Sequence, residues 1–226
     1  MIGQLLKPVE EILEQLDGKE KIVLVGCGGC ATVFHTGGEP EVKEMAGTLS
    51  KKGKKILAAI TPPFGEFTCY APWSEARLSN YQKEIEECDA ILMQCCGDGL
   101  QVVREIIEGK FGLWKPIYPA TNNVGHMGGG PTLFKEKCQQ CGECEIGKLA
   151  GAGVCPLTQC PKGLLNGPCG GSENGKCEVD PERDCAWVMI YERLREMGAL
   201  DKLEEMIEPK DWSKMERPRK IEVAPL

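Results

Sequence analysis

The density of cysteines in residues 138–185 constrains this chain more than any other feature of its sequence. Eight lie there: Cys138, Cys141, Cys144, Cys155, Cys160, Cys169, Cys177 and Cys185. The first three are spaced C-x-x-C-x-x-C, which is how the bacterial ferredoxin pattern begins. Thiolates are the soft ligands that suit iron–sulfur clusters and zinc. Because two-residue gaps let a short loop wrap one metal centre with its N–H groups facing the sulfurs, we expect this stretch to bind metal.

Eight cysteines make two sets of four, which predicts two [4Fe–4S] clusters with four thiolates each. Two structural zinc sites would use the same number of ligands and remain the alternative. The ferredoxin-like triplet and the prolines that follow Cys155 and Cys160 favour clusters, whereas zinc ribbons usually contain two C-x2-C knuckles. Ten residues separate Cys144 from Cys155, so the spacing leaves open which cysteine serves which centre.

The whole chain has 14 cysteines in 226 residues, a proportion that also occurs in secreted disulfide-rich proteins. Residues 1–20 hold five acidic groups and no apolar signal-peptide segment, so we expect metal binding in the cytoplasm instead. The net charge of −7 argues against nucleic acid or a membrane surface as a partner. No apolar run approaches the roughly 18 residues of a membrane span, so we expect no membrane insertion.

The first half of the chain alternates between apolar runs typical of buried strands and amphipathic stretches typical of helices. Strands are expected at residues 21–25, 55–60, 90–93 and 116–119. Helices are expected at residues 4–16, 40–51, 79–87 and from Asp98 onward. This alternation predicts a doubly wound parallel sheet of the flavodoxin-like kind.

We expect two domains, a flavodoxin-like α/β domain over residues 1–130 and a cysteine-rich iron–sulfur domain over residues 131–226. The glycine-rich residues 122–131 are interpreted as a linker or turn between them. The second domain has little periodicity and would lack an adequate core without metal. A helix is expected from Cys185 to about Glu205, followed by an extended tail anchored by Trp212.

In an open parallel sheet, ligands bind beyond the carboxyl ends of the strands where the strand order reverses. A flavodoxin-like order, 2-1-3-4, places that point between the first and third strands. Cysteines from three separate loops would then meet in one crevice, and a third cluster there would have four ligands: Cys27, Cys30, Cys69 and Cys96. Cys95 is expected in the core, and Cys88 is expected to be a buried structural thiol.

Residues 26–31 also match G-x-G-x-x-A after a strand, which is the pattern of a dinucleotide-binding loop. The acidic residue that usually ends the second strand is missing, because the chain there continues into Thr61 and Pro62. A catalytic nucleotide-binding oxidoreductase is therefore the weaker alternative, and glycines that merely allow tight packing are another. His35 and His126 are interpreted as loop residues, although either could serve a metal or a proton relay.

The run from Leu164 to Gly171 (LLNGPCGG) continues through Gly175–Val179 (GKCEV) to Cys185-Ala186-Trp187. This run resembles the methylenetetrahydrofolate reductase C-terminal-domain family, whose small free-standing members include the iron–sulfur V subunit of the acetogen-type reductase. The resemblance extends to Val25-Gly26-Cys27 and to Cys96-Gly97.

This resemblance implies a partner: a separate TIM-barrel subunit that holds flavin and reduces methylenetetrahydrofolate. It implies that the present chain carries metal centres and no flavin, has no catalytic residue, and relays electrons from a further electron-donor protein to that flavin. Because the family is also described as zinc-binding, a structural zinc module that stabilises the reductase stays open as the alternative.

Overall fold

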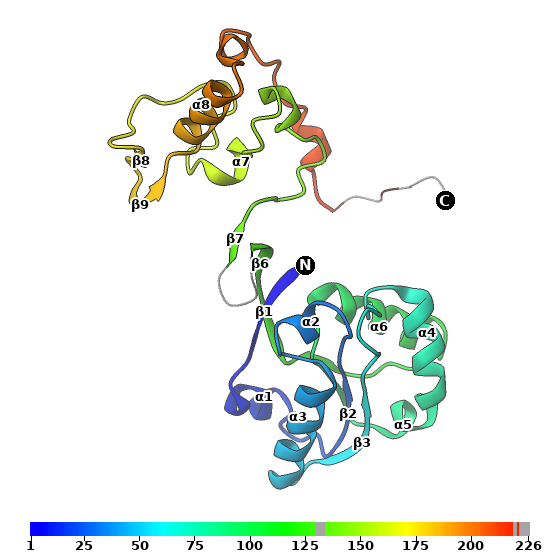
Figure 1. Ribbon diagram of the computed structural model, residues 1–226. Coiled ribbons are helices and arrows are strands. Elements are labelled where there is room, and N and C mark those ends of the chain that lie inside the picture. The colour runs from blue at the N-terminus through cyan, green and yellow to red at the C-terminus, as the bar shows by residue number, and fades with distance from the viewer. Residues whose placement is uncertain (130–133, 219–220, 222–226) are drawn as a thin grey trace. The chain divides into compact units, whose positions relative to one another are not determined.

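The computed structural model describes residues 1–129, 134–218 and 221 and divides the chain into two compact units, Met1–Phe134 and Lys135–Leu226 (Figure 1). The domain boundary expected between residues 130 and 131 lies outside the described residues.

Four strands of the N-terminal unit form a parallel sheet in the order β3-β2-β4-β5. They are β2 (Lys21–Val25), β3 (Lys55–Ile60), β4 (Ala90–Met93) and β5 (Ile117–Pro119). All four expected strands are confirmed, and their order is the expected 2-1-3-4. The short runs rich in valine, isoleucine and leucine form these strands because a central parallel strand is buried on both faces.

Helices cover both faces of this sheet (Figure 1). They are α1 (Val9–Gln15), α2 (Cys30–Val33), α3 (Glu39–Lys51), α4 (Ala71–Leu78), α5 (Gln82–Glu87) and α6 (Gly97–Gly109). Ile22 and Leu24 of β2 pack in one apolar cluster with residues of α1 and α3. Val23 and Val25 pack in the other cluster with residues of α4, α5 and α6. The doubly wound arrangement is therefore confirmed.

The N-terminal segment differs from the prediction. Ile2–Leu6 forms strand β1, which pairs antiparallel with β6 (Thr121–Gly129), so the expected helix at residues 4–16 is wrong for its first turn. The helix begins only at Val9, since a residue before proline, here Lys7, is disfavoured in helical conformation. The glycine-rich residues 122–129 are likewise strand and not linker, because they pair with a segment more than 100 positions away. Gly130 and Pro131 lie outside the described residues.

Helix α4 was not predicted, and neither were the four-residue helices α2 and α7 (Pro156–Gln159). Ala71–Leu78 forms α4, whereas a helix was expected only from residue 79; Ser79–Tyr81 is a short 3-10 turn that leads into α5. Proline in the first turn of α4 is compatible with a helix, since the first N–H groups have no partner there.

The C-terminal unit is irregular, with short elements. These are β7 (Phe134–Glu136, in which the division between units falls), α7 (Pro156–Gln159), β8 (Lys176–Cys177), β9 (Asp180–Asp184) and α8 (Ala186–Glu196), with 3-10 turns at Gly147–Leu149, Leu200–Leu203 and Trp212–Met215. Its apolar core consists of Leu149, Ala152, Trp187, Ile190 and Leu194. Helix α8 ends before the expected Glu205, because Gly198 turns the chain with φ +68°.

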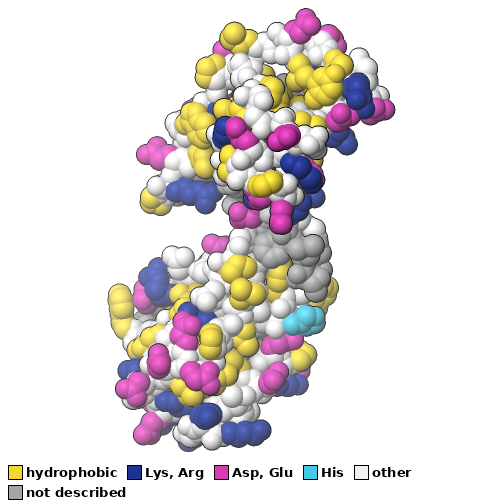
Figure 2. All heavy atoms as spheres, turned by 90° about the vertical axis from the view of Figure 1, so that its left-hand side faces the viewer, with side chains coloured by type: hydrophobic (Ala, Val, Ile, Leu, Met, Phe, Trp, Pro, Cys, Tyr) yellow, Lys and Arg dark blue, Asp and Glu magenta, His cyan; other side chains and the backbone are white. Residues whose placement is uncertain are grey.

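Charged side chains of both signs are interspersed on the face displayed in Figure 2, without a large patch of one sign. None of the helices in the described part of the chain is long and apolar enough to cross a membrane.

Replacing Leu92 by alanine should lower the free energy of unfolding of the N-terminal unit by about 2–5 kcal/mol, because this fully buried side chain would leave a cavity in the sheet core. Leu5→Ala is the matched control: Leu5 is 59 % exposed on β1, so its loss should change stability by less than about 0.5 kcal/mol. Urea unfolding of both variants checks this. Equal destabilisation would contradict the assignment of Leu5 to an exposed strand position.

Candidate metal centres

The parallel sheet brings thiols from three loops to one end of the N-terminal unit. Cys27 follows β2, Cys69 lies on the loop after β3, and Cys96 caps α6 directly after β4. Cys27 and Cys96 are buried and Cys69 is exposed. The charges of these three groups interact, which places them in one neighbourhood as the strand order predicted.

Desolvation by the surrounding protein has the largest effect on the pKa values of Cys69 and Cys96. It raises the pKa of the Cys69 thiol to about 11, and the neighbouring Cys96 and Cys27 add to that shift. Burial also raises the pKa of Cys96, while N–H groups at the start of α6 oppose the increase. The thiols of Cys69 and Cys96 are therefore protonated at neutral pH, and a metal would have to displace these protons in order to bind there.

Cys30 does not join this neighbourhood through any contact that we observe. It is the first residue of α2, and its Sγ accepts a hydrogen bond from the N–H of Ile2 at 3.4 Å. Within the described residues, no group of three or more His, Cys, Asp or Glu side chains is arranged to hold a metal ion. The predicted third cluster with Cys27, Cys30, Cys69 and Cys96 therefore stays a prediction.

The glycines of residues 26–31 are packed against the chain itself. A Cβ added to Gly28 would lie 1.9 Å from the carbonyl oxygen of Pro63, and one added to Gly26 would lie 2.3 Å from that of Gly37. Helix α2, which follows, is only four residues long. This geometry favours glycines that allow tight packing over a loop that cradles a dinucleotide phosphate.

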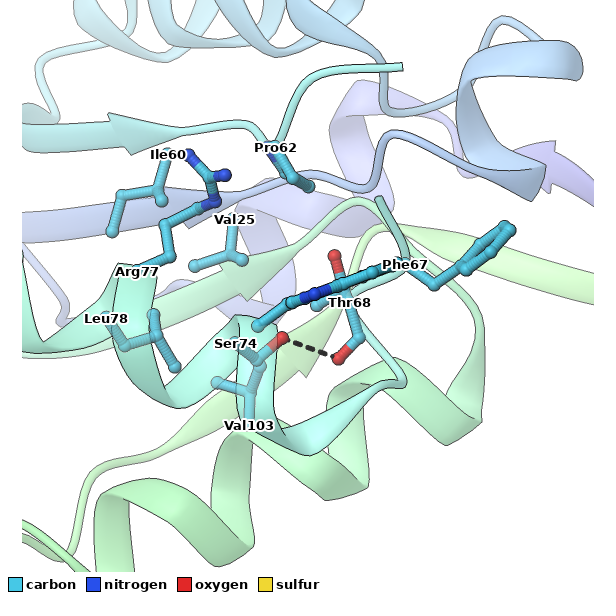
Figure 3. A pocket seen from close by; sticks show the side chains of 10 residues that line it. Val25, Ile60, Pro62, Phe67, Thr68, Ser74, Arg77, Leu78 and Val103 are labelled. Carbon is cyan, nitrogen blue, oxygen red and sulfur yellow. Dashed lines mark hydrogen bonds between the residues drawn. The ribbon is translucent and has the colours of Figure 1, made fainter. Parts of the chain in front are cut away.

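A pocket next to this loop lies among side chains from β2, β3, α4 and α6 (Figure 3). Its volume is about 10 Å³, roughly what one water molecule needs, so it has no room for a flavin or nicotinamide ring. Ser74 closes it by donating a hydrogen bond to the carbonyl of Thr68 at 2.8 Å. Outside it, aromatic side chains surround the exposed thiol of Cys69 in a shallow hollow: Phe67, Tyr70 and Trp73.

The remaining candidates of the N-terminal unit have structural surroundings. Cys88 is buried and its thiol donates to the carbonyl of Ile85 at 3.2 Å, which confirms the expected structural role. Cys95 is also buried, as expected, and burial raises its pKa well above the ordinary value. His35 lies on an exposed turn with its Nδ1 3.2 Å from Glu41, and His126 lies in β6 and not in a loop.

The eight cysteines of the C-terminal unit all lie at turns or element ends. Cys155 and Cys160 flank α7, Cys185 caps α8, and Cys177 lies in β8. The others lie in connecting loops: Cys138, Cys141, Cys144 and Cys169. None of the eight is fully buried, and Cys160 and Cys185 pack against the edge of the small core.

Backbone N–H groups point at the sulfurs at the start of three cysteine loops. Gln140 donates to Cys138 Sγ, Gly171 donates to Cys169 Sγ, and Gly29 donates to Cys27 Sγ, each at 3.4 Å. In the first two loops a residue with positive φ makes the turn, Gln140 at +56° and Gly170 at +78°. Such N–H groups stabilise a metal-bound thiolate, so the loops are suited by their local shape to sulfur ligands.

A charged pair lies beside Cys169. Its thiol donates to Glu178 Oε1 at 3.3 Å, and Lys162 pairs with the same carboxylate. The hydrogen bonds from Lys162 and from Cys169 lower the pKa of Glu178. Lys162 is 41 % exposed, so water screens this group.

A second lysine, Lys210, lies beside Cys141 and was missed by the sequence analysis. Its side chain is completely buried, and its Nζ donates to the carbonyl of Glu143 at 2.8 Å. Burial would lower the pKa of Lys210, but the charge and hydrogen bond of Cys141, and then of Glu145, raise it above the ordinary value. No pattern in the sequence predicts this contact, because 69 positions separate Cys141 from Lys210.

Residues 118–213 match the family described as "Methylene-tetrahydrofolate reductase C terminal". This part of the chain is thus related to the C-terminal domain of that reductase, and it contains all eight cysteines of residues 138–185. The match does not extend to Val25-Gly26-Cys27 or Cys96-Gly97, which also contributed to the resemblance seen in the sequence. Neither a curated protein nor a solved structure matches the chain significantly.

The donor set therefore fits thiophilic metal centres in its chemistry: eight accessible thiols on tight turns, with N–H groups facing two of the sulfurs. The cysteine side chains would have to move closer together to bind a metal, because the described residues contain no group of three or more potential ligands that is already assembled.

Cys69 in the metal-free, reduced protein should react slowly with iodoacetamide, although it is exposed. Only thiolate reacts, and a pKa of about 11 in place of 9.0 lowers its fraction about a hundredfold at any pH below 9. Peptide mapping at pH 8 should therefore show much slower labelling in the folded chain than in the same chain in guanidinium chloride. Equal rates would contradict the raised pKa.

Proposed function

We propose that this chain is an iron–sulfur electron-transfer subunit of a methylenetetrahydrofolate reductase complex. The observation that carries the proposal is the family match over residues 118–213, which encloses eight cysteines, two of them with backbone N–H groups turned toward their sulfurs. The subunit would correspond to the V subunit of the acetogen-type reductase.

Cysteines 138–185 would hold two [4Fe–4S] clusters, and these supply the transfer of single electrons when bound. The chain's own residues hold the sulfurs on turns and at element ends, and the N–H groups of Gln140 and Gly171 are directed at two of them. Reduction of methylenetetrahydrofolate requires a hydride equivalent and a proton, so two single electrons must be combined at a flavin. That flavin would belong to a TIM-barrel partner, and a further protein would donate the electrons.

The N-terminal unit would hold a third cluster in the crevice with Cys27, Cys69 and Cys96. Cys30 would have to turn away from Ile2 in order to complete four ligands. This unit would have a flavodoxin-like fold. The subunit would work in the cytoplasm, and its fourteen free thiols support a reducing compartment of this kind.

Anaerobically purified protein should contain iron and acid-labile sulfide in equal amounts, about eight of each per chain for two clusters and about twelve for three. A dithionite-reduced sample should give the EPR spectrum of reduced [4Fe–4S] clusters. Zinc without iron would contradict the proposal and identify the alternative, a structural zinc module.

Cys141→Ala should lower the iron content by about four per chain, because one cluster would lose a ligand. Cys88→Ala is the matched control, since this thiol is buried in the N-terminal core and should leave iron and sulfide unchanged. An equal loss of iron in both variants would indicate general unfolding and contradict the assignment.

A further inference from the structure

The C-terminal tail of the chain forms hydrogen bonds and ion pairs with the loop that contains the C-x-x-C-x-x-C pattern. The N–H of Asp211 donates to Glu143 Oε2 at 3.1 Å, and Lys214 Nζ lies 3.4 Å from Glu143 Oε1. Further along, Arg217 Nη2 donates to the carbonyl of Gln139 at 3.2 Å. Residues 210–217 therefore contact this loop repeatedly, although the sequence predicted only an extended tail anchored by Trp212. Trp212 is 53 % exposed, and Lys210 is the buried side chain.

The buried ammonium group of Lys210 has three N–H donors, and acceptors of the loop surround it. The carbonyl of Glu143 accepts at 2.8 Å, and Glu145 Oε1, itself on a side chain only 3 % exposed, lies 3.5 Å away. The thiol of Cys141 donates to the same carbonyl of Glu143 at 3.1 Å, so its sulfur lies beside the ammonium group. A lysine in such a position is unusual, because ammonium groups are seldom buried without several partners.

Metal binding at Cys141 would change what Lys210 contacts. As a thiol, Cys141 donates its own proton to the carbonyl of Glu143 at 3.1 Å. As a metal-bound thiolate it has no proton to give and becomes an acceptor, so the ammonium group would face a negatively charged sulfur. A charge-assisted hydrogen bond of this kind is stronger than a neutral one, and screening by water is weak at a buried site.

We propose that Lys210 is a positioning residue of the metal centre at Cys138, Cys141 and Cys144, and that its buried positive charge stabilises the metal-bound thiolate of Cys141 and the reduced form of that centre. This inference rests on the proposed function for its redox part. Reduction adds one electron and therefore one negative charge, which a nearby cation favours. Hydrogen bonds and charge near the sulfurs are among the factors that set cluster potentials.

Lys162 beside Cys169 offers an internal comparison. It also pairs with a carboxylate next to a thiol, but it is 41 % exposed and screened by water. The two lysines thus provide the same charge at a buried and an exposed position. The effect of removing the charge should be larger at Lys210.

The test compares Lys210→Met with wild type and with two controls, each isolated anaerobically with its metal. Lys202→Met is the matched control, since this exposed lysine pairs with Glu205 and Asp201 and has no contact with a thiol among the residues that the structure describes. Lys210→Arg keeps the charge. An EPR-monitored redox titration should give a more negative midpoint potential for one cluster in Lys210→Met, a smaller shift in Lys162→Met, and wild-type values in Lys202→Met and Lys210→Arg.

Metal release to a chelator is the second measurement and does not depend on which metal is bound. Lys210→Met should lose metal several-fold faster than wild type and Lys202→Met. Wild-type potential together with wild-type release in Lys210→Met would overturn the inference. If Lys210→Met does not retain metal at all, Lys210→Gln, which keeps a donor without the charge, decides: an unchanged potential overturns the role of the charge and a more negative one supports it.

Wild-type protein that contains zinc and no iron would overturn the proposed function but not the inference. In that case the release rates alone judge Lys210, and equal rates in Lys210→Met and wild type would overturn it.

Discussion

The C-terminal unit has too small an apolar core to account for its fold, and this constraint underlies our interpretation of the whole chain. Six of the buried apolar residues in the described part of the chain lie in this unit, and five of them form its one cluster: Leu149, Ala152, Trp187, Ile190 and Leu194. Small domains with so little core usually depend on disulfides or metal. Under the proposed function the free thiols of this unit would supply the ligands for metal, and metal binding and folding would then be one process.

The N-terminal unit is stabilised by a large apolar core instead. Its sheet is buried on both faces and needs no metal to fold, because Ile22, Leu24 and their neighbours fill two continuous apolar clusters. Thiols at the ends of its strands are held by a scaffold that is already rigid. Burial raises the pKa values of Cys69 and Cys96, so any metal that binds there must displace protons against the environment that the fold provides.

Much of this could be predicted from the sequence because the decisive signals are local. Apolar runs such as residues 21–25 and 90–93 identify the strands, and the topology that follows from them brings Cys27, Cys69 and Cys96 into one neighbourhood. The C-x-x-C-x-x-C spacing and the turn after Cys138 are likewise local features. A parallel sheet therefore allowed distant thiols to be grouped without any direct signal of their contact.

Two of the errors concern contacts between segments far apart in the sequence. Leu5 and Leu6 fit a helical period, but their segment pairs with β6 as a strand. The strand β6 was itself missed, because its glycines are typical of a linker or turn. Lys210 was missed because a lysine in a polar tail is normally solvated, and only the fold shows that it is buried against Cys141. Hydrophobic periodicity indicates which face of a segment is buried. It does not identify the distant segment that pairs with it.

The central claim is that thiol-bound metal holds the C-terminal unit together while the N-terminal sheet is independent of it. Hydrogen exchange measured by mass spectrometry, on anaerobically prepared protein before and after removal of metal by a chelator, tests this most directly. The account predicts that peptides of α8 and of the Cys138–Cys144 loop lose their protection while peptides of β2 and β4 retain it. Unchanged protection of α8 in the metal-free chain would contradict it.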